Sequence, residues 1–231
     1  MVRLLIHVEG ETEEVFVNEV LAGHLFRSGY ESVGARLMGN ARLRQRRGGI
    51  RSWSSVRSDI IRHLREDSVA ISTLMVDYYG LPRTGDKAWP GRNQAAGLPF
   101  DKKASCVKDA LHKDLVAKLG PGFDPRRFIP NVIMHEFEGL LFSDCAAFSR
   151  GIQKPHLQAD FQMIRDEFET PEEINDSPVT APSKRVLKLI PNYEKPLLGA
   201  LAILQIGLET IRAECPQFNQ WLIDLERATK T

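Results

Sequence analysis

Two kinds of hydrophobic pattern alternate along the first part of the chain. Short, nearly continuous apolar runs predict buried strands at residues 4–8, 33–38, 69–76 and 128–134. Between them, apolar residues spaced three and four apart predict helices at 12–26, 54–65 and 101–119. This alternation is typical of a parallel sheet covered by helices, so we expect an α/β fold.

The remainder of the chain predicts mostly helices, most clearly at residues 197–214 and 216–227. We expect an α/β domain over residues 1–150 and a helical C-terminal extension over residues 151–231 that packs on it, with one single domain as the alternative. Proline and glycine are frequent from residue 81 to about 100. This stretch predicts a long loop, and such loops inside a domain are often lids or binding loops.

Composition sets broad limits on the class of protein. The chain has 231 residues, with 42% hydrophobic and 26% charged, which is ordinary for a globular protein with a full core. It has no apolar run long enough to cross a bilayer, no signal-peptide pattern, and three widely spaced cysteines. We therefore expect a cytoplasmic protein. The net charge of +1 does not by itself predict a polyanionic partner.

Acidic residues follow three of the four predicted strands. Glu9 and Glu13 come after the first, Asp77 after the third, and Glu136 and Glu138 after the fourth. Because the ends of parallel strands lie at one edge of a sheet, we expect these carboxylates to converge. Gathered carboxylates repel one another unless a cation neutralises them, which favours Mg²⁺ or Mn²⁺ and chemistry on a phosphate. For any single acid, the alternative is a helix cap or a solvated turn.

An arginine-rich segment suggests a nucleic-acid partner, DNA or RNA. Residues 36–65 contain nine arginines and one acid, Asp59. A guanidinium can hold a phosphate with two hydrogen bonds, so such a cluster predicts phosphate contacts. The alternative is a solvated helix face with salt bridges. The residues we expect to contact nucleic acid are Arg42, Arg44, Arg46, Arg47 and Arg51.

Four stretches of the chain together resemble a known family. They cover residues 8–16, 75–82, 135–144 and 171–195. The Glu-Gly-Glu-Thr-Glu sequence at residues 9–13, a hydrophobic strand that ends in Asp77 and the alternating α/β order together resemble the Toprim domain of topoisomerases, primases and OLD (overcoming-lysogenization-defect) nucleases. All four look closer still to a bacterial Toprim-like family catalogued as domain of unknown function 4276. The resemblance covers nearly the whole chain, and the four stretches are specific only in combination.

The resemblance implies a Toprim-like parallel sheet of about four strands and a role for particular acids. Glu9 matches the family's general acid/base or metal ligand, Glu13 matches a second glutamate of the nuclease branch, and Asp77 matches the first Asp of a Mg²⁺-binding Asp-x-Asp motif. The second Asp of that motif is replaced by Tyr79. This departure removes a ligand that topoisomerases and primases use.

His135, Glu136 or Glu138, after the fourth predicted strand, could supply a replacement ligand. Otherwise the site binds metal weakly or is a relic without turnover. Lys184 is a further catalytic candidate, because a cation beside a phosphate stabilises the charge of a transition state. Lysines near a helix start are more often structural.

The sequence therefore supports more than one function. The first is a Mg²⁺-dependent nuclease in phage or plasmid defence, partnered by an ATPase related to the ABC (ATP-binding cassette) class, as the resemblance implies. The second is a catalytically degenerate module that binds nucleic acid or the partner ATPase without cleavage. A phosphatase or phosphotransferase acting on a small molecule is a third. A topoisomerase is rejected, because the nucleophilic tyrosine of those enzymes belongs to a separate domain.

Overall fold

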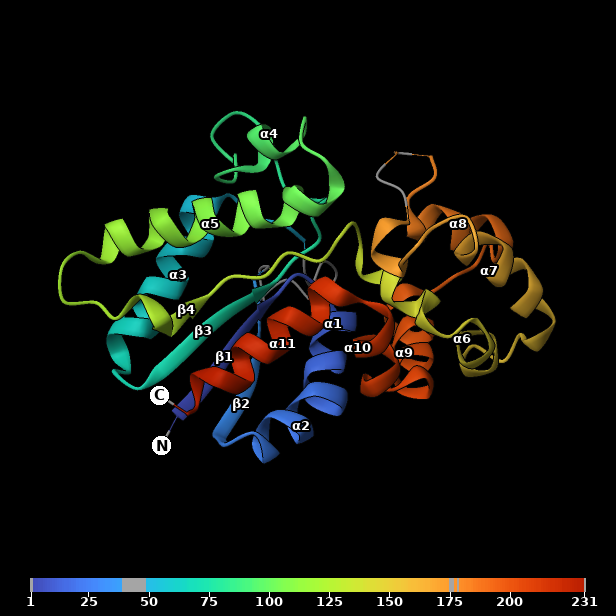
Figure 1. The fold of residues 1–231 in the computed structure, drawn as a ribbon, viewed down its shortest axis with the longest axis horizontal. Helices are drawn as coiled ribbons and strands as arrows, with labels where there is room; N and C mark the ends of the chain where they lie inside the picture. The colour runs from blue at the N-terminus through green and yellow to red at the C-terminus, as the bar shows by residue number, and fades with distance from the viewer. Residues whose placement is uncertain (1, 39–48, 175–176, 178, 231) are drawn as a thin grey trace.

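The computed structural model describes residues 2–38, 49–174, 177 and 179–230 of the chain. Its centre is a four-stranded, all-parallel sheet with the strand order β2-β1-β3-β4 (Figure 1). The strands are β1 (Val2–Val8), β2 (Tyr30–Leu37), β3 (Ala70–Met75) and β4 (Phe128–Ile129). The predicted α/β fold is confirmed.

Helices cover both faces of the sheet. Those that flank it are α1 (Glu11–Phe16), η1 (Val17–Leu21), α2 (Ala22–Arg27), α3 (Trp53–Glu66), α5 (Phe100–Leu119) and α11 (Pro216–Ala228), while α4 (Arg92–Ala95) packs on α5. In Figure 1, α3 and α5 lie on one side of the sheet, whereas α1, α2 and α11 lie on the other. Both faces of the central strands are therefore buried, which explains why β3 is apolar or buried at every position.

The remaining helices lie mostly beyond the carboxyl ends of the strands (Figure 1). They are η2 (Pro125–Arg127), η3 (Phe137–Ser143), α6 (Cys145–Gly151), η4 (Pro155–Leu157), α7 (Gln158–Arg165), η5 (Pro171–Glu173), α8 (Pro182–Leu189), η6 (Lys195–Gly199), α9 (Ala200–Ile206) and α10 (Leu208–Glu214). One hydrophobic cluster joins Leu4 of β1 to Ile203 of α9 and Leu225 of α11. The C-terminal helices thus share the core of the sheet, and a domain boundary near residue 150 stays a prediction.

Two predicted elements differ from the structure. The fourth strand was expected to reach residue 134 but is paired only at Phe128–Ile129, because Pro130 has no N–H to donate to a ladder. The chain meets β3's end again through an isolated bridge between Asp77 and Ile133. The expected helix over 197–214 is broken at Gly207, where φ is +79°. The helices on either side of that glycine meet at 85°.

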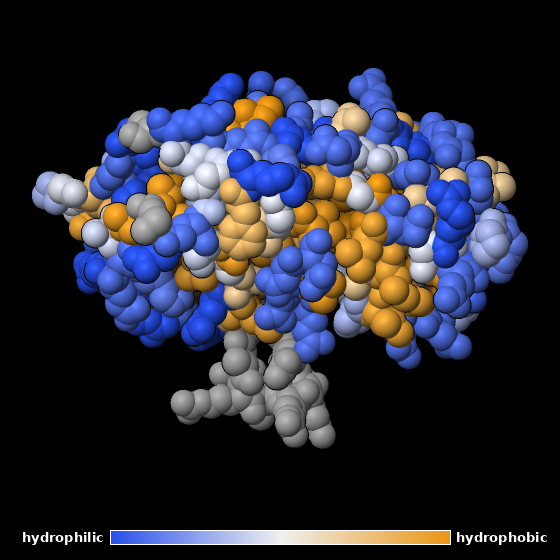
Figure 2. Space-filling view, turned by 90° about the horizontal axis from the view of Figure 1, so that it is seen from below, coloured by the Kyte–Doolittle hydropathy of each residue, from blue (hydrophilic) through white to orange (hydrophobic). Residues whose placement is uncertain are grey.

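A stripe of exposed leucines follows η6 and α9. Leu197, Leu201 and Leu204 are 56%, 41% and 47% exposed, and their spacing places them on one face of the helix. We call these three residues the leucine stripe. Figure 2, seen from below, shows apolar surface on the half of the molecule where α9 lies. Within the described residues, no single helix has the length and hydropathy to cross a bilayer, although the bent pair 195–206 and 208–214 meets both criteria jointly.

Candidate functional site

The connection between β1 and α1 positions two glutamates. β1 ends at Val8, and Glu9 and Gly10 lead directly into the first turn of α1. Glu13 lies in that first turn and is 3% exposed. There its negative charge interacts favourably with the positive end of the helix dipole. A Cβ atom on Gly10 would lie only 2.9 Å from Oε2 of Glu13. The absence of a side chain at Gly10 therefore lets the carboxylate of Glu13 pass close to the backbone.

Asp77 links the end of β3 to the segment that follows β4. It follows β3, forms the bridge to Ile133, and accepts a hydrogen bond of 2.9 Å from the backbone N–H of Phe137 at Oδ1. Glu138, which follows Phe137 in the sequence, lies in η3 and is fully buried. No hydrogen-bond donor in good geometry reaches either of its carboxylate oxygens within the described part of the chain. The end of the sheet therefore holds two buried acids close together.

These acids converge on Lys195, which lies at the start of η6. Its Nζ atom is 3.1 Å from Oε2 of Glu138, 3.8 Å from Oε1 of Glu13 and 3.9 Å from Oδ2 of Asp77. Glu9 adds a fourth carboxylate, whose buried Oε2 accepts no hydrogen bond among the residues that the structure describes. We call Glu9, Glu13, Asp77 and Glu138 the carboxylate cluster. The structure thus brings together acids from three separate connections at one sheet edge.

Burial and the charges of neighbouring acids shift the pKa values of Glu9, Asp77 and Glu138. Burial, followed by the charge of Glu13, raises the pKa of Glu9 to about 7, against opposing effects of Lys195 and a hydrogen bond from the Asp77 backbone. Burial also raises the pKa of Asp77 well above its usual range and raises that of Glu138, although Lys195 opposes both shifts. Glu9, Asp77 and Glu138 therefore hold protons more tightly than exposed acids do.

The same interactions act in the opposite direction on Lys195. Burial alone lowers the pKa of an ammonium group, but the carboxylates of Glu138, Asp77 and Glu13 outweigh that effect and raise it. Lys195 therefore stays charged, and one ammonium faces four carboxyl groups.

The donor chemistry of the cluster fits a divalent cation only in part. Carboxylate oxygens are the ligands that Mg²⁺ and Mn²⁺ prefer, and Glu9 and Glu138 offer buried oxygens without a donor. However, no three Asp, Glu, His or Cys side chains in the described ranges are arranged to hold one ion together. The acids as they stand surround an ammonium group and are not spaced as the ligands of one metal ion.

Three other candidates have different surroundings. Oε2 of Glu136 accepts a hydrogen bond of 2.9 Å from the N–H of Ser183, at the start of α8, rather than joining the ion pairs of Lys195. Nδ1 of His135 lies 3.1 Å from the carbonyl oxygen of Ile174, and the imidazole is buried. Lys184 is exposed on α8. The ligand role of Glu136 and the catalytic role of Lys184 stay predictions.

Residues 39–48 of the arginine segment lie outside the described residues, but the residues on either side of them are described. The four positions outside are Arg42, Arg44, Arg46 and Arg47. The N–H groups of Met38 and Gly49 donate to the carbonyl oxygens of Val8 and Glu9, at 3.0 Å each. Arg51, the fifth predicted contact, is exposed. The segment therefore leaves and rejoins the described chain beside the carboxylate cluster.

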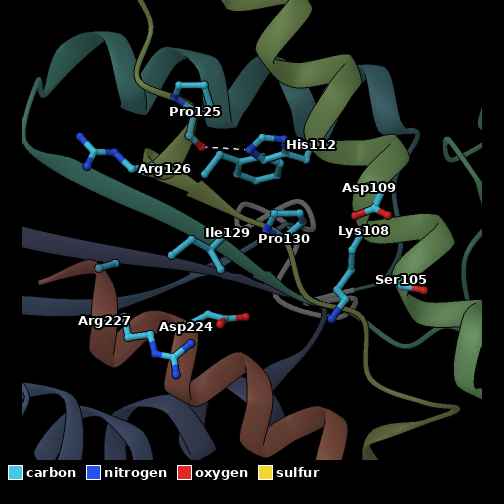
Figure 3. A pocket seen from close by; sticks show the side chains of 12 residues that line it. Ser105, Lys108, Asp109, His112, Pro125, Arg126, Ile129, Pro130, Asp224 and Arg227 are labelled. Atoms are coloured by element: carbon cyan, nitrogen blue, oxygen red, sulfur yellow. Dashed lines mark hydrogen bonds between the residues drawn. The ribbon is translucent and has the colours of Figure 1, made fainter. Parts of the chain in front are cut away.

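A pocket of about 190 Å³ opens next to the cluster. It is lined by Glu9, Gly10, Glu11, Thr12, Glu13, Gly49, Lys195 and Pro196. A larger pocket of about 610 Å³ lies elsewhere, between α5, β4 and α11 (Figure 3). There, Lys108 and Asp109 of α5 face Asp224 and Arg227 of α11, and His112 bonds the carbonyl oxygen of Pro125. None of the four clustered acids lines this larger pocket.

Sequence reasoning missed Lys195. The residue lies far along the chain from every acid that it contacts, between Glu194 and Pro196, where no periodic pattern marks it. Its one signal was its place at the end of the stretch 171–195, the fourth that resembled a known family. On this signal, Lys195 was as good a catalytic candidate as Lys184.

Comparison with known proteins gives one match. The family described as "Domain of unknown function (DUF4276)" matches residues 8–226, which is nearly the whole chain. No curated protein and no solved structure matches this chain.

Proposed function

The chain belongs to the DUF4276 family, and we propose that it is a metal-dependent enzyme that cleaves phosphodiester bonds. One observation carries the proposal: carboxylates from three sheet-edge connections converge within 3.1–3.9 Å of a single cationic atom, Nζ of Lys195. Carboxylates held this close are costly without a cation, and stability alone does not require them. Open α/β sheets bind their ligands at this edge.

The residues of the cluster divide into two roles. Glu13, Asp77 and Glu138 would hold a divalent cation, which when bound would polarise a phosphate and lower the pKa of a water molecule. Glu9 is the proton acceptor, because a pKa of about 7 suits a general base near neutral pH. Phe137 holds Asp77 in place through its backbone N–H.

Lys195 takes the charge-neutralising role that the sequence suggested for Lys184. Its ammonium already contacts the acids, whereas Lys184 is exposed on α8. The side chain of Lys195 is 39% exposed and lines the adjacent pocket with Pro196, where a phosphate could meet it. A polyanionic substrate, DNA or RNA, is favoured by the arginine segment that rejoins the chain at Gly49 beside Glu9.

A relationship to the Toprim domain is part of this proposal. Three features support it: the Glu9–Glu13 sequence after β1, Asp77 after β3, and the parallel sheet. In a Toprim-type site, Glu138 of η3 supplies the carboxylate that Tyr79 does not. A role in phage or plasmid defence beside an ATPase of the ABC class extends the same resemblance.

The proposal is tested by incubating the purified protein with single- and double-stranded DNA and RNA, in Mg²⁺, in Mn²⁺ and in a chelator. We expect cleavage only with metal. Glu9→Gln and Asp77→Asn should each abolish it, whereas Lys188→Met, at an exposed lysine of α8, should retain it. Lys184→Met separates the two lysines: retained cleavage supports Lys195. Cleavage that survives both Glu9→Gln and Asp77→Asn would rule the site out.

The second candidate is a module that binds nucleic acid or a partner ATPase without cleavage. Two observations favour it: Lys195 neutralises part of the cluster without a metal, and the leucine stripe leaves apolar surface exposed on the same helix. Exposed apolar stripes of this kind mark protein–protein contacts.

This candidate predicts binding that does not depend on the acids. If it is correct, Leu201→Asp should abolish capture of an ATPase encoded next to this chain, while Asp77→Asn should leave it intact. Exposed Met163, on α7, provides the matched control as Met163→Asp. Metal-dependent cleavage by the wild-type protein would rule out a purely non-catalytic module.

A further inference from the structure

Lys195 occupies the point on which the carboxylate cluster converges. Its Nζ atom lies 3.1–3.9 Å from oxygens of Glu138, Glu13 and Asp77. A Mg²⁺ ion bound by these acids would have to lie about 2.0–2.1 Å from their oxygens. Two cations cannot share so small a volume without strong repulsion, so an ammonium and a metal ion compete for the same place.

The acids surround the ammonium at ion-pair distances rather than at metal-ligand distances. As they stand, no three potential ligands in the described ranges are spaced to hold an ion, so the carboxylates have to draw inward when the ammonium leaves. Glu138 is nonetheless fully buried and directed at the same point, and its oxygens have no donor in hydrogen-bond geometry among the described residues. A carboxylate that is built into the core and satisfied only by one ion pair leaves room for a stronger ligand interaction.

Lys195 also has a route out of the cluster. Its side chain is 39% exposed, and it lines the pocket of about 190 Å³ together with Pro196. It lies on η6, a single turn that ends at Gly199. Gly199 packs against Thr12 and Tyr193, so closely that a Cβ atom there would lie 3.1 Å from each. The lysine can therefore leave by rotating its own side chain into the pocket, while the backbone turn stays packed.

We propose that Lys195 is a built-in cation that holds the site closed to metal, and that a divalent ion binds only by displacing its ammonium from Glu138, Glu13 and Asp77 into the adjacent pocket. This inference rests on the proposed function, since it assumes that the cluster binds metal. It adds a regulatory step: anything that draws the ammonium outward, such as the phosphate of a bound substrate, favours metal binding. Substrate and metal would then bind cooperatively.

The test is to measure Mn²⁺ binding by calorimetry to the wild-type protein and to Lys195→Met, Lys195→Arg and Lys188→Met. Lys195→Met should bind Mn²⁺ about tenfold more tightly or better, because the competing cation is gone. Lys195→Arg should bind no more tightly than the wild type, and Lys188→Met, at an exposed lysine, should match it.

A second measurement uses only the wild-type protein, in case Lys195→Met does not fold. Reductive methylation followed by mass spectrometry should modify Lys195 slowly without metal and faster with saturating Mn²⁺, while Lys188 reacts equally in both. Equal Mn²⁺ affinity of wild type and Lys195→Met, or methylation of Lys195 that metal does not accelerate, overturns the displacement and leaves the proposed function standing. Absence of Mn²⁺ binding by both proteins overturns the metal site itself, and with it the proposed function.

Discussion

Lys195 and Glu138 form the closest ion pair of the carboxylate cluster, with Nζ 3.1 Å from Oε2. Glu138 is fully buried, whereas the side chain of Lys195 is 39% exposed. The pair is thus a charge in the core held by a partner at the surface. Replacing Lys195 leaves a buried carboxylate without its ion-pair partner. Replacing Glu138 instead lets the side chain of Lys195 turn into solvent.

A double-mutant cycle should reveal this asymmetry. Lys195→Met should lower the free energy of unfolding more than Glu138→Gln does, and the double variant should be more stable than the sum of the two losses predicts. Because the lysine is partly solvated, we expect a coupling energy of about 1 kcal/mol. Urea denaturation in a chelator measures it. Strictly additive losses would show that the ion pair does not stabilise the fold.

The pH dependence of stability should report Glu9. Its pKa of about 7 in the folded protein lies above its ordinary value of 4.5. Between these values the folded protein keeps a proton that the unfolded chain releases, so stability is highest below pH 4.5 and falls as the pH rises to about 7. The loss is at most about 3–4 kcal/mol, from roughly 1.4 kcal/mol for each of about 2.5 pKa units.

Glu9→Gln should remove that loss. At pH 8 the Glu9→Gln variant should be more stable than the wild type. At pH 4.5 this advantage should be smaller or absent. Urea denaturation of both in a chelator, from pH 4.5 to 8, checks this. Burial also raises the pKa of Glu172 to about 7, but Glu172 is present in both proteins, so the difference between the two profiles reports Glu9 together with its effect on the neighbouring Asp77. Parallel profiles would show that Glu9 is not the titrating group.

Much of the fold and part of the site follow from local signals. Val8 and Met75 end apolar runs that become parallel strands. The acids after them lie at one sheet edge because parallel strands end on the same side, which can be predicted without knowing the distant contacts. The length of β4 was wrong because one proline, Pro130, stops a ladder that hydropathy alone would continue. The break at Gly207 was missed because an isolated glycine does not always end a helix.

Lys195 shows the limit of reading residues one at a time. A lysine between Glu194 and Pro196 has the sequence context of an exposed turn, and only the packing of η6 against α1 brings it to the acids. Glu136 shows the reverse: its position predicted a ligand, but its carboxylate accepts the N–H of Ser183. Local sequence indicated the edge where charges gather, whereas tertiary packing decided which charges meet.

Gly10 offers a way to disturb the site while keeping the fold. Its backbone is extended, with φ of −143°, a conformation that any residue adopts. A Cβ atom there would lie 2.9 Å from Oε2 of Glu13 and push that carboxylate away from the cluster. Gly10→Ala should therefore weaken Mn²⁺ binding about tenfold with little change in thermal stability, since small misplacements of a site residue are costly. Gly80→Ala is the control, because its Cβ would be 3.6 Å from Glu9, an ordinary contact. Equal affinities of the two variants would contradict the prediction.

The loop between β3 and α5 depends on Gly91. This residue has φ of +77°, and a Cβ atom would lie 2.7 Å from the carbonyl oxygen of Cys106 and 2.9 Å from Cβ of Ala110. Gly91→Ala should therefore combine backbone strain with a clash against α5, and cost about 3 kcal/mol or more. Gly85 has the same φ of +77° but nothing described within 4 Å of its Cβ position, so Gly85→Ala should cost only about 1–2 kcal/mol. Urea denaturation of the two variants separates strain from packing. If both lose the same stability, α5 does not hold the loop through Gly91.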